Sequence, residues 1–180
     1  MKKLSVIFVL FCSLAATAQV KKVSLQASGL TCSMCSNAIF KSLQTLDFVK
    51  KVDANIKTST FEVFFNPNTQ VDFDKLKKKV EDAGFFVAGL TATINFDSTS
   101  ALSDGHVKIG GNTYHLLNSK DQVLNGDQTV RLLDEGFVSA KEYKKNSALT
   151  SMECYKTGHA GDCCSKDGLA AGTRIFHIAI

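Results

Sequence analysis

The chain has 180 residues, of which 44% are hydrophobic and 21% charged, with one proline, no tryptophan and six cysteines. This is the composition of a globular protein, so a disordered, collagen-like or multi-span membrane chain is excluded, and the length allows one domain or two small ones. The formal net charge of +4 is too small to indicate a partner made of nucleic acid.

The first 18 residues have the three parts of a secretion signal. Two lysines precede an apolar run over 4–16, and residues 16–18 read Ala-Thr-Ala, which is typical of a cleavage site. The run is shorter than the roughly 20 residues that span a bilayer. We expect a signal peptide cut after Ala18 and a periplasmic or secreted mature chain with no stable membrane insertion. Removal of Cys12 leaves an odd number of cysteines in an oxidising compartment.

The residues from 19 to 90 alternate between strand and helix patterns. Apolar residues recur at every second position in the expected strands and at helical spacing in the expected helices. The pattern predicts strands over 21–28, 49–56, 61–65 and 85–90 and helices over 33–46 and 72–83. This strand-helix-strand-strand-helix-strand order predicts a ferredoxin-like domain, with an antiparallel sheet and both helices on one face.

The residues from 91 to 180 have a different sequence pattern. Short apolar runs alternate with Gly, Asn and Asp, and Gly110-Gly111 is typical of a two-residue hairpin turn. The pattern predicts strands over 92–97, 106–110, 112–118, 128–133, 136–140 and 173–180. We therefore expect an α+β chain whose second domain, 91–180, is a small, mostly-β barrel or sandwich. It is weakly similar to barrels of the oligonucleotide/oligosaccharide-binding type, without the basic, aromatic surface that single-stranded nucleic acid requires.

A pair of cysteines lies where the first strand meets the first helix. Gly29 permits a sharp exit from the strand, Cys32 lies in the loop, and Cys35 lies in the first helical turn. The helix dipole and unpaired N–H groups at this end favour thiolates. Two thiolates without a nearby His or carboxylate form a soft site, which favours Cu(I), with Hg(II) and Zn(II) as competitors.

Residues 29–35 read Gly-Leu-Thr-Cys-Ser-Met-Cys, and this motif in a ferredoxin-like pattern resembles the heavy-metal-associated domain. Leu30 stands where the family usually has Met, and Phe85 is the aromatic residue expected beside the metal loop. The family includes copper chaperones, soluble domains of copper-pumping ATPases and the exported mercury-binding protein. The resemblance covers 20–90 and implies that Cys32 and Cys35 bind the metal, with a metal-transport ATPase or other metal-handling protein as partner.

Other interpretations of the cysteine pair remain open at this point. A thiol-disulfide oxidoreductase or a mercury-binding transport protein would also use Cys32 and Cys35. In a purely structural exported protein the two cysteines would form a disulfide. Met34 is a candidate third soft ligand, although we expect it to be exposed or packed on the loop. The sequence contains no catalytic triad, phosphate loop or paired-carboxylate site, so we do not expect an enzyme.

A second group of ligand-type residues lies near the end of the chain. Cys154, His159, Cys163 and Cys164 fall within a short Gly-containing stretch and together supply a ligand set for zinc or copper. A disulfide from Cys154 to Cys163 or Cys164 is the structural alternative. The remaining histidines lie in strand-like segments and are expected to be structural rather than ligands: His106, His115 and His177.

Overall fold

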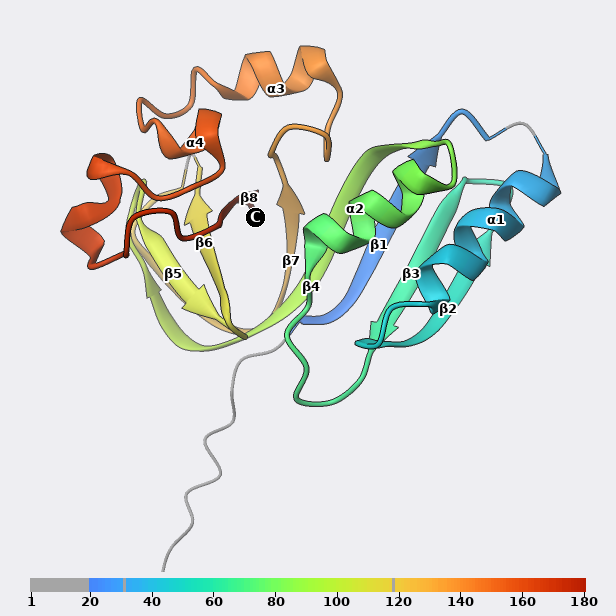
Figure 1. Ribbon diagram of the computed structural model, residues 1–180. Coiled ribbons are helices and arrows are strands. Elements are labelled where there is room, and N and C mark those ends of the chain that lie inside the picture. Colours follow the sequence, from blue (N-terminus) through green and yellow to red (C-terminus); the bar gives the residue numbers. More distant parts are fainter. Residues whose placement is uncertain (1–19, 31, 118) are drawn as a thin grey trace, which may run out of the picture.

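The computed structural model describes residues 20–30, 32–117 and 119–180. Over these residues it forms one eight-stranded mixed sheet in the order β2-β3-β1-β4-β7-β8-β6-β5 (Figure 1). In chain order, the elements are β1 (Val20–Ser28), α1 (Ser33–Gln44), β2 (Val49–Asn55), β3 (Thr60–Phe65), α2 (Phe73–Asp82), β4 (Phe86–Ala101), β5 (His106–Ile109), β6 (Asn112–Leu116), β7 (Gln122–Leu132), α3 (Ala140–Asn146), α4 (Cys154–Thr157), the 3₁₀ helix η1 (Asp162–Asp167) and β8 (Ile175–Ala179). The expected signal peptide lies outside the described residues.

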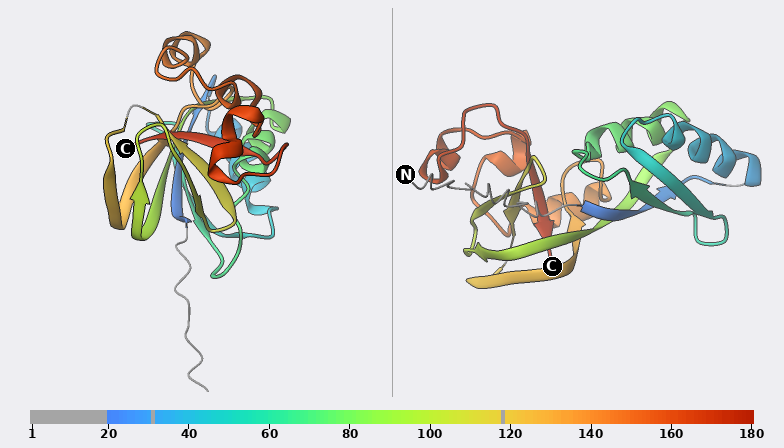
Figure 2. Two further views of the ribbon diagram at one scale, coloured as in Figure 1. Left: turned by 90° about the vertical axis from the view of Figure 1, so that its left-hand side faces the viewer. Right: turned by 90° about the horizontal axis from the view of Figure 1, so that it is seen from below.

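The N-terminal half has the predicted ferredoxin-like fold. Strands β2, β3, β1 and β4 are antiparallel neighbours, and α1 and α2 cover one face of them (Figures 1 and 2). Alternation along β1 directs Val23, Leu25 and Ala27 into the core. The buried stripes of the helices meet them there, with Ile39 and Leu43 from α1. The same core contains Phe73, Leu76 and Val80 from α2.

Strand β4 passes through the predicted domain boundary without a break. Its first part pairs with β1 from Phe86 to Ile94, and its second part pairs with β7 from Thr91 to Ala101. The two strands expected over 85–90 and 92–97 are therefore one strand. A register shift between Phe96 and Thr99 interrupts the β4–β7 ladder, and such bulges bend a sheet. The sheet curls at this point, and the C-terminal strands turn around toward α4 (Figure 1).

The C-terminal half contains more helix than the sequence indicated. Strands β5 and β6 form the expected hairpin, with positive φ values at Gly110 and Gly111. The strand predicted over 136–140 is wrong, because Ser139 caps α3 by accepting a hydrogen bond from the backbone N–H of Glu142. Helices α3, α4 and η1 were not predicted. Strand β8 pairs in parallel with β6 and antiparallel with β7. The expected barrel or sandwich type is not confirmed.

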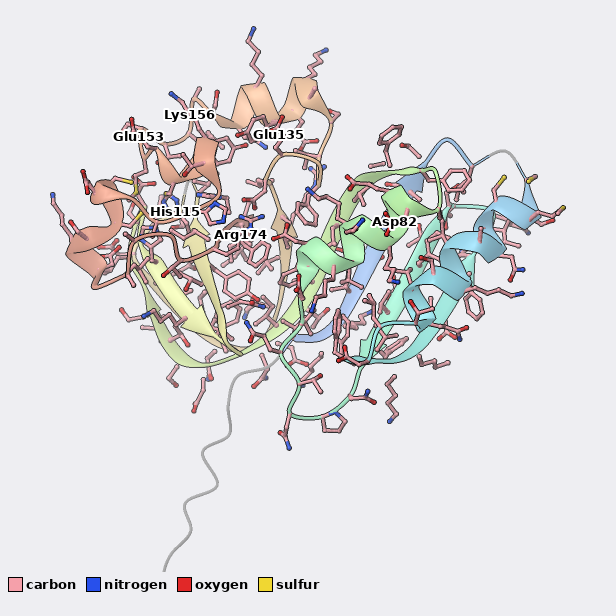
Figure 3. The ribbon with its side chains drawn as sticks, viewed as in Figure 1. Asp82, His115, Glu135, Glu153, Lys156 and Arg174 are labelled. Atoms are coloured by element: carbon pink, nitrogen blue, oxygen red, sulfur yellow. The ribbon has the colours of Figure 1, made fainter. Side chains whose placement is uncertain are left out.

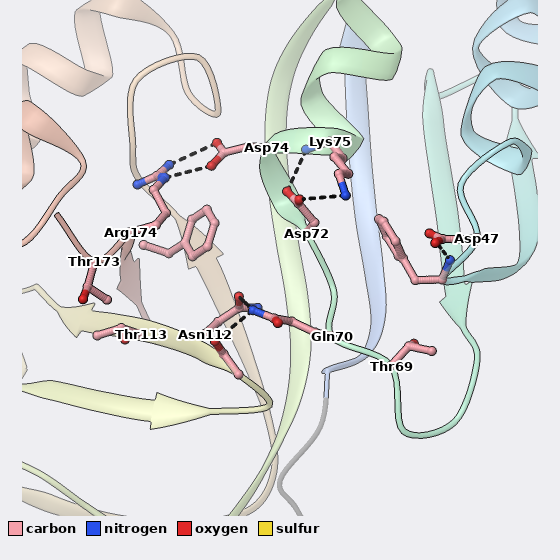
Figure 4. A pocket seen from close by; sticks show the side chains of 13 residues that line it. Asp47, Thr69, Gln70, Asp72, Asp74, Lys75, Asn112, Thr113, Thr173 and Arg174 are labelled. Carbon is pink, nitrogen blue, oxygen red and sulfur yellow. Dashed lines mark hydrogen bonds and ion pairs between the residues drawn. The ribbon is translucent and has the colours of Figure 1, made fainter. Parts of the chain in front are cut away.

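Ionic and polar contacts join the two halves beside the sheet (Figure 4). The Arg174 guanidinium donates to both carboxylate oxygens of Asp74 on α2, at 2.8 and 3.1 Å, and to Asp134 at 3.1 Å. The Gln70 side chain donates to the Gly111 carbonyl at 2.9 Å. A cleft of about 720 Å³ between the halves is lined by Gln70, Asp74, Gly111 and Arg174. The helical layer of the N-terminal half is thus attached to the C-terminal strands.

Candidate metal centre

The sulfurs of Cys32 and Cys35 lie together at the start of α1. Cys32 is the N-cap of the helix, and the backbone N–H of Cys35 donates to its sulfur at 3.3 Å. The two Sγ atoms are 2.7 Å apart, and both thiols are free. Cys32 is exposed and Cys35 is half-buried, so an ion or an incoming ligand can reach the pair from solvent.

The electrostatics of this helix end favour the metal-binding form of Cys32. Hydrogen bonds from the side chain and the backbone N–H of Cys35 lower the pKa of the Cys32 thiol below its ordinary value. Since the thiolate is the form that binds metal ions, this shift prepares Cys32 as a ligand. Zn–S bonds of about 2.3 Å at a tetrahedral angle place two sulfurs about 3.8 Å apart, so the pair must separate by about 1 Å to hold such an ion.

The loop before the helix is held by backbone conformation and by packing. Gly29 has φ of +82°, and a Cβ built there would lie 3.9 Å from the Phe85 ring. Leu30 and Phe85 pack against the core, which places Phe85 beside the loop as expected. Met34 is 81% exposed and does not support the two sulfurs by packing.

The C-terminal cysteines also come together, but His159 does not join them. The Sγ atoms of Cys154, Cys163 and Cys164 all lie within 4.8 Å of one another. His159 is exposed, and its Nδ1 lies 2.8 Å from the Thr157 carbonyl oxygen. The four-residue ligand set expected from the sequence is therefore not assembled as a group.

Two histidines that we expected to be structural contact this cluster instead. His106 Nε2 lies 3.9 Å and His115 Nδ1 3.8 Å from the sulfur of Cys154. They come from the neighbouring strands β5 and β6, where they face each other in the register. The predicted hairpin, whose two strands carry these histidines, was the sequence feature that could have placed them together. Nothing in the sequence placed Cys154 against that hairpin.

The surroundings of this cluster shift the pKa values of its members. Burial, with the nearby His177, lowers the pKa of His115 to about 4, so its imidazole is neutral at neutral pH. Burial and the neighbouring thiols raise the pKa of Cys154. At Cys163, partial burial opposes ionisation, but hydrogen bonds from the Cys154 backbone and the Cys164 side chain hold its pKa below the ordinary value.

The two cysteine groups lie at opposite ends of the molecule. The start of α1 is at one end, and α4 with the β5–β6 hairpin is at the other, near the labelled His115 (Figures 1 and 3). The two groups are therefore separate candidate sites.

In the described part of the chain no helix has the length and hydropathy needed to cross a membrane.

The N-terminal half matches a known family. The model of the heavy-metal-associated domain matches residues 24–86. A copper-transporting ATPase of Arabidopsis thaliana, RAN1, is 31% identical over 94 residues, which are 52% of this chain and 9% of that protein. A copper-exporting P-type ATPase of Staphylococcus aureus is 32% identical over 119 residues, 66% of this chain and 14% of that protein. The chain thus spans only a small part of the length of these relatives.

Solved structures also resemble this half. Oxidized MerP from Ralstonia metallidurans is 30% identical, with 39% of this chain and 96% of that chain covered and a TM-score of 0.36. The yeast copper transporter domain CCC2A is 35% identical, with 36% and 88% covered and a TM-score of 0.33. The family match, the ferredoxin-like topology and the paired cysteines at the first strand–helix junction agree. Residues 24–86 of this chain are a heavy-metal-associated domain.

Proposed function

We propose that this protein is an exported binding protein for soft metal ions, with Cu(I) as its cargo, which it captures and carries or sequesters through Cys32 and Cys35. The observation that supports this most directly is the position of the two sulfurs, 2.7 Å apart at a helix N-terminus, where hydrogen bonds from the side chain and the backbone of Cys35 lower the pKa of Cys32. Thiolates are soft ligands, and soft ligands favour Cu(I) over the harder divalent ions.

Exposure of the pair allows transfer by ligand exchange. Cys32 is exposed, so a thiolate of a partner protein can bind the ion before Cys35 releases it. The ion then never leaves thiolate coordination. Because the relatives include copper-transporting ATPases, we propose a metal-transport ATPase or another metal-handling protein as the partner.

The first test removes the sulfurs one at a time. Cys32→Ser and Cys35→Ser should each weaken Cu(I) binding at this site by at least a hundredfold, measured by competition with a chromophoric Cu(I) chelator under reducing conditions. Met34→Ala is the matched control, because it lies between the two cysteines, is 81% exposed and should leave the affinity unchanged. A variant lacking both sulfurs that kept wild-type affinity and stoichiometry would refute the proposal.

Two alternatives have their own readouts. If Hg(II) transport is the role, Hg(II) will displace Cu(I) from Cys32 and Cys35 when one competing thiol buffers the free concentrations of both ions. If thiol-disulfide exchange is the role, the wild-type chain will catalyse repeated reduction of a disulfide substrate with a small dithiol supplied as the electron donor, and Cys32→Ser will abolish this turnover. Neither result is expected for a Cu(I) carrier.

A further inference from the structure

The C-terminal half contains a second convergence of soft and borderline ligands, away from the paired cysteines of α1. His106 on β5, His115 on β6 and Cys154 at the start of α4 bring two imidazole nitrogens and one sulfur within 4.8 Å of one another. The side chain of His115 is 0% exposed and that of His106 is 1% exposed. Cys154 is fully buried as well.

The distances fit coordination of one ion better than simple hydrogen bonding. Zn–N bonds of about 2.0 Å and Zn–S bonds of about 2.3 Å at tetrahedral angles place nitrogen and sulfur about 3.5 Å apart. The two separations from the Cys154 sulfur are 3.9 Å for His106 Nε2 and 3.8 Å for His115 Nδ1. Each nitrogen and the sulfur can thus share an ion after shifts of a few tenths of an ångström, and the two nitrogens lie within 4.8 Å of each other.

Each imidazole is oriented from its far side by a carboxylate. His106 Nδ1 lies 2.5 Å from Asp167 Oδ2, and His115 Nε2 lies 2.7 Å from Asp104 Oδ1. In a neutral imidazole the nitrogen facing the carboxylate carries the proton, so the nitrogen facing Cys154 has a free lone pair. Carboxylate–histidine pairs of this kind orient the ligands of metal ions.

Within the part of the chain that the structure describes, the two lone pairs share one possible hydrogen-bond donor, the Cys154 thiol. Both face the same sulfur, and a thiol has a single hydrogen to donate. Among the described residues, at least one buried nitrogen therefore lacks a hydrogen-bond donor, which is unfavourable in a protein interior. A cation between the three residues would satisfy both nitrogens and the sulfur together.

Two further thiols can complete the coordination. Cys163 and Cys164 lie within 4.8 Å of Cys154, on η1, and their own sulfurs are 3.4 Å apart. The two histidines and these two thiols do not form one group within 4.8 Å, so a fourth ligand from η1 must move toward the histidines. Because adjacent residues rarely both bind one ion, only one of the two thiols would do so. Apolar side chains pack around these cysteines and limit access of water: Met152, Ala160, Leu169 and Ile175.

We propose that His106, His115 and Cys154, with Cys163 or Cys164, form a second metal site for a borderline or soft d¹⁰ ion of the Zn(II) and Cu(I) class. Two nitrogens and two sulfurs are a tetrahedral set that binds Zn(II) in a closed structural site, whereas Mg(II) and Ca(II) prefer oxygen ligands. This site goes beyond the carrier function of Cys32 and Cys35, and its ion would hold α4 and η1 against the β5–β6 hairpin.

The test uses the full chain carrying Cys12→Ser, Cys32→Ser and Cys35→Ser. These substitutions remove the proposed carrier site and the thiol of the expected signal peptide. Under reducing conditions, titration with Zn(II) followed by native mass spectrometry should give one bound ion per chain. Co(II) in its place should give sulfur-to-cobalt charge-transfer absorption. Failure to bind either ion, with all remaining thiols titrating as free, would overturn the proposal while leaving the carrier function standing.

Substitutions at the carboxylates keep the test independent of folding defects. Asp104→Asn and Asp167→Asn alter half-exposed side chains and should each weaken Zn(II) binding about 10- to 100-fold. The matched control is His159→Gln, which is close in sequence to the cysteines but outside the cluster and should have no effect. Equal weakening by His159→Gln would overturn the assignment. So would a Cys154–Cys163 or Cys154–Cys164 disulfide in the isolated protein whose reduction yields no Zn(II) binding.

Discussion

Single backbone positions set the geometry of the loop before α1, the proposed metal loop. Gly29 follows β1 directly and adopts φ of +82°, in the region that side chains with a Cβ rarely occupy. This conformation turns the chain toward Cys32 at the start of α1. The position of the two sulfurs therefore depends on a residue that carries no ligand atom.

A pair of glycine substitutions isolates this effect. Gly29→Ala should lower the free energy of unfolding by about 1 kcal/mol, because alanine is strained at this positive φ. Gly89→Ala in β4 is the matched control, since an added Cβ at either position has its nearest neighbour at 3.9 Å and only Gly29 has a positive φ. Urea unfolding of the metal-free protein should show no loss of stability for Gly89→Ala. Equal losses for both variants would contradict the backbone explanation.

At the scale of one element, α2 shows how the sequence encodes both ends and the inner face of a helix. Asp72 caps the first turn by accepting a hydrogen bond from the Lys75 N–H at 2.9 Å. Gly84 follows the helix with φ of +87°. Between these ends, Phe73, Leu76 and Val80 are fully buried. The helix thereby supports the sheet behind the metal loop and presents Asp74 to Arg174.

The two terminal aspartates of α2 should differ in their effect on stability. Asp72→Ala should cost about 1 kcal/mol, because it leaves an N–H of the first turn without its acceptor. Asp82→Ala should cost clearly less, since the 2.7 Å pair between Lys78 and Asp82 is exposed to solvent. Thermal unfolding measured by circular dichroism at fixed metal content distinguishes them. The cap assignment fails if Asp82→Ala is the more damaging change.

For the whole molecule, the continuous strand β4 is the main structural connection between the halves. It pairs with β1 on one edge and with β7 on the other, and residues 91–94 pair with both. The bidentate contact of Arg174 with Asp74 adds a connection between layers. A chain break at residue 90 would thus fall inside a strand rather than in a linker.

This continuity predicts how fragments should behave. The predicted N-terminal domain, residues 19–90, can be compared as an isolated fragment with a longer fragment of residues 19–97. The shorter fragment loses the pairs Val20–Ile94, Lys22–Thr93, Val23–Ala92 and Ser24–Thr91. Both fragments contain Cys32 and Cys35 and should bind one Cu(I), but the longer one should melt at a higher temperature. Equal melting temperatures would show that these pairs contribute little.

The sequence by itself determined the N-terminal fold and the location of its candidate site. Period-two alternation and helical stripes identified the elements because each of them buries one face against a single core. The motif over 29–35 identified the helix end that carries Cys32 and Cys35, since the relevant contacts are local. The sequence pattern could not distinguish one long β4 from two shorter strands, because a bulge leaves no clear signal in the apolar alternation.

Tertiary structure alone decided the composition of the C-terminal cluster. His159 is five residues from Cys154, yet the turn at Gly158 and the contact with Thr157 leave it in solvent. His106 and His115 are 48 and 39 residues away, yet they contact the Cys154 sulfur. The parallel pairing of β6 with β8 and the packing of α4 against the strands create this contact. Such pairings depend on the whole core, so proximity in the sequence could not indicate which histidines meet the cysteine.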